Sequence, residues 1–491
     1  MLSRNRTGVN GNVPLKKPKK RCLWLLCQLL LGWLVLFILQ QTLAPWPKPI
    51  PGVRLEPSRP FLADADVKPD NAYFYIRQMG NFSSGSTNTK ALFEERERWA
   101  ANGPAGAPYP AMDEELTLAA NNIELARNAA NTPNCQVTTI HSLNDYAKGV
   151  SGACNTARHL AYRAESAVIH GDWKSATADF RINLLLGNHV ARGGGITDRL
   201  IGTVIHRNTT DAIRRCALEQ TPPPEFFREM QAALDETART LEPAEETLRH
   251  EWLLLRETTD TDIAIPMSSG IRMIGGGPDP ECGVGTRALL LAYRCGLLIP
   301  LGSSPWQTRR HFDAVGTHVI AASAAGDCRF DIMTLIQGPR KYVPLCFIND
   351  PVGRYLTGIS LRGMPYTITR IVQEKAELQG TQIALAIRQY QLQHDGTPPA
   401  ALADLVPSCV STLPADPFSG SGEPFHYRTD GKGWTLYSVY KNGVDDGGLY
   451  NVNRADDRLQ HKDKLDIIYS SNEFARRRAD YAERHKDDTG K

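Results

Sequence analysis

Acidic and amide side chains gather near the C-terminal end of the sequence in two short loops. The first loop holds Asn442, Asp445 and Asp446 beside two glycines, and the second holds Asp463 and Asp466. Calcium binds several oxygen ligands, and glycines permit the tight backbone that such loops need. We therefore predict a calcium site at these five residues. A solvated Asp-Gly turn is the alternative, because the spacing of an EF-hand is absent.

Other patterns with catalytic potential are weaker. Asp260 and Asp262 have the spacing of the metal-binding carboxylate pair of Golgi-type glycosyltransferases, but no alternating strand and helix pattern precedes them. G-x-S-x-G, H-E-x-x-H and Walker sequences are absent, and His250-Glu251 lacks a second histidine on its helical face. Four histidines on three successive predicted helices would bind a metal only if they converged: His159, His170, His189 and His206.

The acidic loops follow a segment whose pattern predicts one helix and short strands. Apolar residues recur at helical spacing in residues 367–394, whereas residues 425–428 and 435–440 alternate like half-buried antiparallel strands. Residues 430–433, with two glycines, supply the turn between these strands. Packing the helix on three or four such strands would bury side chains from both, namely Leu385, Tyr390, Leu405, Tyr427 and Leu436.

This order of elements resembles the C-terminal half of the type II secretion major pseudopilin. Residues 367–469 carry the resemblance, through a helix end, an Asp-Pro turn, two tyrosine-containing strands and an Asp-Gly loop. The matching residues are Tyr390, Gly396, Pro399, Asp416-Pro417-Phe418, His426-Tyr427, Tyr437-Ser438, Asn442-Gly443, Gly447-Gly448 and Asp466-Ile467. The resemblance implies a long helix on a small antiparallel sheet, with calcium in the acidic loops.

The sequence also departs from a pseudopilin. It has no processed leader with a glutamate just inside the hydrophobic helix, and its hydrophobic segment lies far from residues 367–469. The connection after the first acidic loop, residues 449–464, is much longer than that of a pseudopilin. We therefore predict a pseudopilin-like module joined to a larger envelope protein, similar to those of planctomycete-type bacteria, and not a pilus subunit.

The central region is predicted to be mostly helical. From Met112 to about Thr258 apolar residues recur every three or four positions, with breaks at residues 170–172, 192–195 and 221–224. This pattern is typical of an antiparallel array of amphipathic helices. The predicted fold class is α+β, with an N-terminal transmembrane helix, a mostly α-helical outer domain and a C-terminal long helix packed on a small antiparallel sheet.

An uncharged apolar stretch, Cys22 to Ala44, is long enough to cross a bilayer as a helix. Residues 1–21 carry seven basic and no acidic side chains, which favours a cytoplasmic N-terminus and an outer location for the rest of the chain. We predict an uncleaved signal anchor in a bacterial inner membrane. A cleaved signal peptide and a buried core helix are the alternatives.

Charge and cysteine content describe the predicted outer part. Removing the seven positive charges of residues 1–21 from the net charge of +3 leaves −4, which is not typical of a nucleic-acid-binding protein.

Eight of the ten cysteines lie beyond the anchor, and an even number in an oxidising compartment favours disulfides. Proximity suggests the pairs Cys135–Cys154, Cys282–Cys295 and Cys328–Cys346, and buried free thiols are the alternative.

The sequence predicts six segments, which are a basic tail at 1–21, the transmembrane helix at 22–44, a Pro/Gly-rich stem at 45–110, a helical domain at 111–360, the pseudopilin-like domain at 361–470 and a charged tail at 471–491. Within the stem we expect a short strand at 73–79 and a short helix at 90–100. The charged tail is expected to be helical or disordered.

These features together predict a membrane-anchored envelope protein with a non-catalytic binding or assembly role, related to secretion. Its partners would be the lipid bilayer at residues 22–44 and a protein of the envelope or secretion system, and not nucleic acid. The alternative is a membrane-anchored enzyme with its active site in the helical domain, with a Golgi-type glycosyltransferase as a third interpretation.

Overall fold

The computed structural model describes residues 27–32, 34, 35, 38, 46–80, 89–138, 143–264, 305–337, 350, 357, 358, 361, 363–453, 458, 460, 462 and 464–485. The chain forms two compact units. The smaller unit comprises residues 1–48, 262–315 and 333–360, and the larger unit comprises residues 49–261, 316–332 and 361–491.

The predicted transmembrane helix at 22–44 lies mostly outside the described residues. Those of its residues that are described, 27–32, 34, 35 and 38, are helical. Within the described parts of the chain, no helix combines the length and the apolar character that crossing a membrane requires. The anchor therefore stays a prediction.

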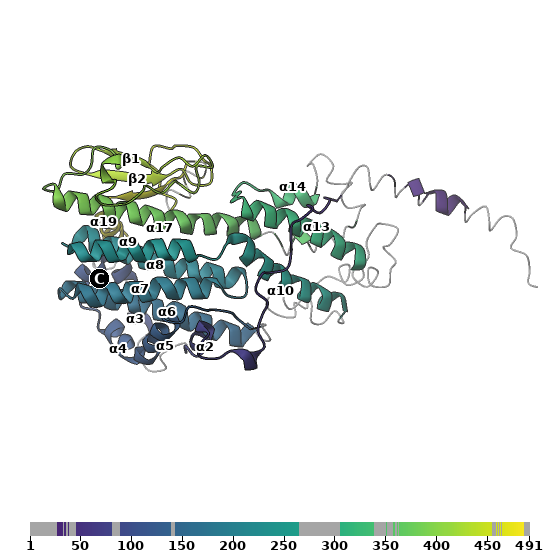
Figure 1. Cartoon of the computed structure of the whole chain (residues 1–491), viewed down its shortest axis with the longest axis horizontal. Helices are drawn as coiled ribbons and strands as arrows, with labels where there is room; N and C mark the ends of the chain where they lie inside the picture. The colour runs from purple at the N-terminus through teal and green to yellow at the C-terminus, as the bar shows by residue number, and fades with distance from the viewer. Residues whose placement is uncertain are drawn as a thin grey trace, which may run out of the picture. The chain divides into compact units, whose positions relative to one another are not determined.

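The first part of the larger unit is helical (Figure 1). Its elements are η1 (Asp64–Asp66), α2 (Ala72–Ile76), α3 (Thr89–Asn102), η2 (Gly103–Gly106), α4 (Pro110–Leu118), α5 (Ala120–Ala130), α6 (Leu143–Ile169), α7 (Trp173–Ala191), α8 (Ile196–Glu219), α9 (Pro224–Thr240) and α10 (Ala244–Ala264). Helices α6, α7 and α8 pack on one another, and α9 packs on α7. We call α6 to α9 the helical array; the helices that apolar spacing predicts here are confirmed.

The ends of these helices follow local chemistry. Gly171 has a φ of 78°, which glycine adopts without strain, and it ends α6. Asp172 then caps α7, because its side chain accepts a hydrogen bond from the Ser175 N–H at 3.0 Å. Pro224 begins α9, at a position where its missing N–H would have no helical partner.

The predicted stem at 45–110 contains packed helices. The helix expected at 90–100 is confirmed as α3, but the strand expected at 73–79 is wrong, because this segment begins as α2. Asn71 caps α2 by accepting a hydrogen bond from the Tyr73 N–H at 3.0 Å, and this local bond favours a helical turn. Ile76 and Met79 are buried in a core that also contains Ile123.

The later described elements include the only sheet that the structure describes. They are α13 (Pro305–Ala324), α14 (Ile332–Gln337), α17 (Met364–Gln393), η5 (Leu402–Leu405), β1 (His426–Thr429), β2 (Trp434–Ser438), β3 (Ile467–Ser470) and α19 (Glu473–Arg484). The strands form an antiparallel sheet in the order β1-β2-β3, with Leu436 opposite Tyr427 on one side and Tyr469 on the other. A mostly helical chain with a small C-terminal antiparallel sheet, as predicted, is confirmed; a helix follows the sheet.

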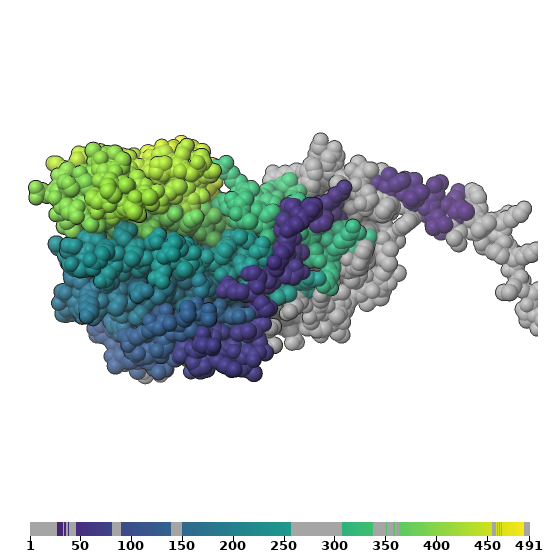
Figure 2. Space-filling model, viewed as in Figure 1, coloured from purple at the N-terminus to yellow at the C-terminus, as the bar shows by residue number. Residues whose placement is uncertain are grey.

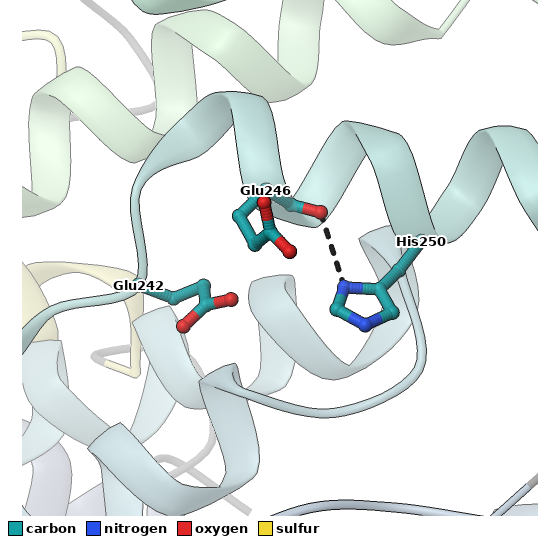
Figure 3. Close-up of side chains that lie close together, drawn as sticks. All are labelled: Glu242, Glu246 and His250. Carbon is teal, nitrogen blue, oxygen red and sulfur yellow. Dashed lines mark hydrogen bonds between the residues drawn. The ribbon is translucent and has the colours of Figure 1, made fainter. Parts of the chain in front are cut away.

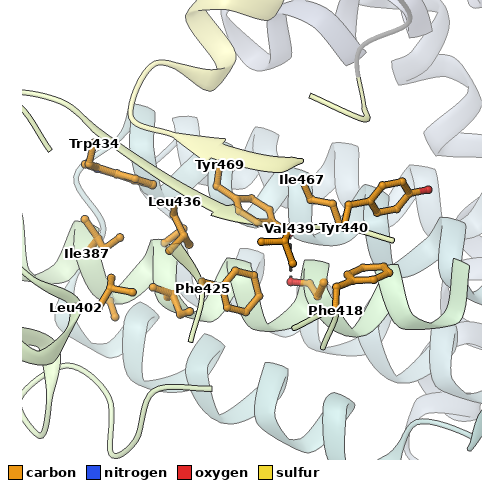
Figure 4. Packing of buried hydrophobic residues seen from close by; sticks show 14 of the residues in the cluster. Ile387, Leu402, Phe418, Phe425, Trp434, Leu436, Val439, Tyr440, Ile467 and Tyr469 are labelled. Atoms are coloured by element: carbon orange, nitrogen blue, oxygen red, sulfur yellow. Dashed lines mark hydrogen bonds between the residues drawn. The ribbon is translucent and has the colours of Figure 1, made fainter. Parts of the chain in front are cut away.

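Helix α17 lies between the sheet and the helical array. It contacts β2, β3 and η5 on one side and α8 and α9 on the other (Figures 1 and 2). Ile383 and Ile387 share a buried cluster with Leu436 of the sheet (Figure 4). Leu378 and Leu385 join a second cluster within the array. We call α17 together with residues 394–470 the C-terminal module.

One glycine allows the sheet to approach this helix. A Cβ atom at Gly380 would lie 2.4 Å from the Tyr469 ring, so the close approach of β3 to α17 requires glycine here. The ring is buried, and its hydroxyl donates a hydrogen bond to the Ala376 carbonyl at 3.2 Å. Of the side chains predicted to be buried here, Leu385, Leu405 and Leu436 are fully buried, and Tyr390 and Tyr427 are partly buried.

The charged tail predicted at 471–491 is helical over α19 and packs against α3. Arg477 Nη1 lies 2.9 Å from Asp211 Oδ2 on α8. The Arg215 guanidinium lies over the ring of buried Phe474, 5.2 Å from its centroid. The tail is therefore part of the larger unit in its described residues.

Within the smaller unit, Trp46 stacks on His311 with ring centroids 4.3 Å apart. The buried Asp350 lies 2.8 Å from His311 Nδ1, and it accepts a hydrogen bond from the Thr308 hydroxyl at 3.2 Å. These contacts hold residue 46 against helix α13.

The disulfide predicted between Cys135 and Cys154 is wrong, because both residues are free thiols. Cys135 is buried and donates to the His189 carbonyl at 3.4 Å, and burial raises its pKa to about 12. Cys328 is also a free thiol, whereas Cys282, Cys295 and Cys346 lie outside the described residues. Cys154 lies on α6, whereas the Cys135 thiol contacts the His189 carbonyl on α7.

Candidate functional site

The predicted calcium ligands lie in the connection between β2 and β3. We call residues 442–448 the acidic loop. In this loop Asp446 Oδ2 accepts a hydrogen bond from Asn442 Nδ2 at 2.9 Å, and Asp445 Oδ1 accepts one from the Gly447 N–H at 2.8 Å. Asp466, directly before β3, reaches the same loop, because its Oδ2 accepts from the Gly448 N–H at 2.9 Å. These hydrogen bonds place Asn442, Asp445, Asp446 and Asp466 in one loop region, but the carboxylate oxygens of the three aspartates do not all lie within 4.8 Å of one another. Asp463 lies outside the described residues.

Of the described residues of this set, Asp466 is the one whose pKa is raised above its usual value. It is fully buried, and its Oδ1 has no hydrogen-bond partner. Burial raises its pKa to about 6; the Gly448 N–H opposes the rise, and the charges of Asp446 and Asp445 add to it. A cation or a proton at this position would relieve both the burial and the repulsion.

The outer edge of the acidic loop is held by neighbours from other elements. Burial alone would raise the pKa of Asp445, but the Gly447 N–H, the Tyr437 hydroxyl and His426 together keep this pKa below its usual value. His426 Nδ1 lies 3.3 Å from Asp445 Oδ2, and Arg329 Nη2 donates to the Asn442 carbonyl at 2.8 Å. The loop can offer oxygen ligands only after some of these contacts rearrange.

A second group of ligand-type side chains lies at the start of α10. Ligand atoms from Glu242, Glu246 and His250 all lie within 4.8 Å of one another, and all three residues are buried. Figure 3 shows the three side chains directed toward a common centre. Among the histidine, cysteine, aspartate and glutamate residues that the structure describes, only these three form such a group, which we call the Glu/His group.

Each carboxylate of the Glu/His group has a cationic neighbour. Glu242 Oε2 forms an ion pair with Arg59, while Glu242 Oε1 is buried and has no hydrogen-bond partner. Glu246 accepts from the backbone N–H and the hydroxyl of Ser58, and its Oε2 lies 2.9 Å from Arg249 Nη1. Burial raises the pKa of Glu246, but Ser58 and Arg249 outweigh burial and hold it below its usual value.

His250 meets a carbonyl oxygen at each ring nitrogen. Nδ1 lies 3.1 Å from the Glu246 carbonyl, and Nε2 lies 2.9 Å from the Arg59 carbonyl. A neutral imidazole carries a single N–H, so it can donate to only one of these two oxygens. In the neutral ring, one of the two nitrogens therefore faces a carbonyl oxygen with no hydrogen atom between them.

A cavity of about 540 Å³ lies beside the Glu/His group. Its lining is rich in arginine and glutamate, and consists of Ser58, Arg59, Arg192, Arg239, Thr240, Leu241, Glu242, Pro243, Glu245, Glu246 and Arg249. Arg192 is held in place by donating to the Thr240 carbonyl at 3.0 Å. The cavity gives solvent and small ions a route to both carboxylates of the group.

Our sequence prediction missed the Glu/His group although a signal was present. Glu246 and His250 are four residues apart on α10, a spacing that places side chains on one side of a helix, and Glu242 lies just before this helix. The neighbouring pair His250-Glu251 lacks the second histidine of a metalloprotease sequence. The contribution of Ser58 and Arg59 has no local signal, because they lie more than 180 residues away in the chain.

The four histidines of the predicted helices do not gather at one metal site, because they have separate surroundings. His159 Nε2 lies 3.1 Å from Glu115, His170 Nδ1 lies 2.8 Å from the Ser166 carbonyl, and His206 Nδ1 lies 2.5 Å from Glu374. His189 is buried, and burial together with Arg192 lowers its pKa to about 4. Asp260 and Asp262 lie within helix α10, and not in a loop after it.

No protein-family model, no curated protein and no solved structure matches the chain. The geometry of the acidic loop and of the Glu/His group therefore carries the functional interpretation.

Proposed function

We propose that the chain is a single-pass, membrane-anchored envelope protein of a bacterium, with a non-catalytic binding or assembly role related to secretion. Residues 22–44 anchor it in the inner membrane, with the N-terminus in the cytoplasm and the bulk of the chain outside. The C-terminal module is pseudopilin-like, and calcium bound at the acidic loop stabilises it.

The observation that carries this proposal is the position of α17. One side of this helix packs in the core of the sheet, and the other side packs in the core of the helical array. Arg199 of α8 and Glu374 of α17 form a buried ion pair across the second contact. Because the C-terminal module packs on the helical array through α17, its loops have a fixed orientation relative to the array. A recognition surface requires such a scaffold.

The acidic loop is the part of the module best placed to contact a partner. Two large apolar side chains lie at the surface here, with Val444 55% and Leu449 63% exposed. Calcium bound to Asp445, Asp446 and Asp466 would order the loop and fix these two side chains. The proposed partner is therefore an envelope or secretion protein that binds the loop in its calcium-bound state.

A membrane-anchored enzyme is the second candidate. The cavity lined by Arg192, Arg239 and Glu242 favours it, because charged side chains converge there on a space large enough for a small molecule. Such an enzyme would act on a small acidic substrate, and its activity would not depend on the acidic loop.

The test uses the full-length chain in cells, with a photoactivatable cross-linking residue at Val444. We expect an adduct to a component of an envelope or secretion assembly, and its loss when calcium is chelated. Ile169, which is 51% exposed on the helical array, is the matched control position. Equal adducts at both positions, or an adduct indifferent to chelator, would contradict the proposal. Deleting residues 22–44 should release the protein from the membrane fraction.

A further inference from the structure

The Glu/His group is independent of the acidic loop and of the proposed binding role. It offers two carboxylates and one imidazole in a buried setting. We propose that Glu242, Glu246 and His250 bind a divalent transition metal ion of the zinc, manganese or iron class. Calcium and magnesium take oxygen ligands, whereas a nitrogen ligand beside carboxylates suits these transition metals.

The first argument is the open ligand position on Glu242. Its side chain is 5% exposed, and Oε1 has no hydrogen-bond partner, while Oε2 is paired with Arg59. A buried carboxylate oxygen without a partner is unfavourable, and native proteins rarely leave one in this state. Figure 3 shows the Glu242 carboxylate directed toward Glu246 and His250, so an ion between the three side chains would fill this position.

The second argument comes from His250. With a single N–H, one of its ring nitrogens points a lone pair at a carbonyl oxygen, either that of Glu246 at 3.1 Å or that of Arg59 at 2.9 Å. A histidine that binds a metal through one nitrogen usually donates its other N–H to a carboxylate or a backbone carbonyl. One of the two carbonyls can accept the N–H of a metal-bound His250, and the other must move away from the nitrogen that takes the metal.

The neighbouring cations are compatible with this site. Arg59 and Arg249 pair with the two glutamates, and their side chains are 35% and 22% exposed. Because both guanidinium groups reach solvent, they can turn outward when a metal ion neutralises the carboxylates. Ser58 donates hydrogen bonds to Glu246 Oε1 from its N–H and its hydroxyl, and thus fixes the orientation of that ligand.

The cavity completes the site. Glu242 and Glu246 both line it, so a metal ion can reach them from solvent. Three protein ligands leave a fourth position for water or a small ligand, as in metal sites that exchange their ligands. Arg192 and Arg239 in the same lining would favour an anionic ligand at this position.

The experiment is calorimetric titration of the full-length chain in detergent, without a polyhistidine tag. The protein is stripped with chelator and then kept in excess calcium, so that the acidic loop does not take the added ion. We expect one equivalent of Zn²⁺ or Mn²⁺ to bind. Co²⁺ should give the visible absorption bands of a four-coordinate site. This spectrum detects binding independently of the calorimetry.

Three variants test the assignment. Glu242→Gln and His250→Gln should each weaken binding at least 10-fold, and their circular dichroism in chelator should match that of the parent protein. Glu245→Gln is the matched control, because Glu245 lines the same cavity but is not part of the group; it should bind like the parent. If His250→Gln does not fold, the Co²⁺ spectrum of Glu242→Gln decides alone.

Two results would overturn the proposal. One is the absence of binding by Zn²⁺, Mn²⁺ and Fe²⁺ to the folded parent protein, which would show that the three side chains do not form a metal site. The other is binding that Glu242→Gln leaves unchanged, which would place the metal elsewhere. Neither result bears on the acidic loop, because excess calcium is present in every titration.

Discussion

Arg199 and Glu374 form an ion pair in the interior of the protein, with Nη2 and Oε2 2.5 Å apart and side chains 0% and 1% exposed. The other oxygen of Glu374 lies 2.5 Å from His206 Nδ1. Burial would raise the pKa of Glu374, but Arg199 and His206 outweigh burial and keep it below its usual value. Helices α8 and α17 are therefore joined by charge as well as by apolar contacts.

Removing one partner of this pair should be costly. We expect Glu374→Ala to lower the free energy of unfolding by about 3 to 5 kcal/mol, because it leaves Arg199 buried and unpaired. The double variant Arg199→Met with Glu374→Gln should recover most of that loss, because it leaves no guanidinium unpaired and keeps an amide oxygen for His206 Nδ1. Urea unfolding measures both. A double variant as unstable as Glu374→Ala would show that packing, and not charge, sets the cost.

Asp466 should make stability depend on pH. Its pKa is about 6 in the folded protein against an ordinary value of 3.8, so the folded state binds the proton more tightly. Ionised Asp466 therefore lowers the free energy of unfolding. This loss is absent below pH 3.8, grows as the pH rises and is complete above pH 6, where it reaches at most about 3 kcal/mol.

Asp466→Asn tests this sign. The amide keeps an oxygen that accepts from the Gly448 N–H but carries no charge. In chelator, we expect the variant to be more stable than the parent protein at pH 7.5 and equally stable near pH 4, measured by urea unfolding. Calcium should reverse the order at pH 7.5, because only the parent can bind it. A variant less stable in chelator at pH 7.5 would contradict the assignment.

Gly380 should not tolerate a side chain. A Cβ atom would lie 2.4 Å from the Tyr469 ring, so Gly380→Ala should cost about 1 to 2 kcal/mol despite the higher helix propensity of alanine. Gly363→Ala is the control, because its Cβ would meet nothing within 4 Å. Tyr469→Leu should remove most of the cost of Gly380→Ala. Additive losses in the double variant would mean that the ring is not the obstacle.

The thiols of Cys135 and Cys154 should be accessible to alkylation without any reductant once the protein is unfolded. In the folded protein Cys135 should resist, because it is buried and its pKa is raised to about 12. Mass spectrometry of the alkylated peptides provides the measurement. A peptide pair linked through Cys135 and Cys154 in unreduced protein would contradict the structure.

Periodic apolar residues made much of the fold predictable. The spacing at three and four positions located α7, α8, α9 and α17, and the alternation in residues 425–440 located β1 and β2. The strand expected at residues 73–79 is wrong, because the Asn71 side chain caps a helical turn at the start of this segment.

The polar sites were predictable only where their residues are close in sequence. Asp445 and Asp446 carried a local signal, because they stand directly before two glycines, and Asp466 follows another aspartate by three residues. Glu374 is separated from its partner His206 by 168 residues, and a charged residue in the middle of α17 looks like part of a solvated face. The Glu/His group had a helical spacing, but its burial depends on Ser58 and Arg59, which no local pattern connects to α10.

The most direct measurement of the proposed calcium-stabilised module is thermal unfolding of the full-length chain in detergent, first with calcium and then with chelator. A ligand that binds only the native state stabilises it, so we predict a rise of several degrees with calcium that the double variant Asp445→Ala with Asp446→Ala abolishes. The same melting temperature in calcium and in chelator for the parent protein, or a rise that the double variant retains, would contradict the assignment of the acidic loop as a calcium site.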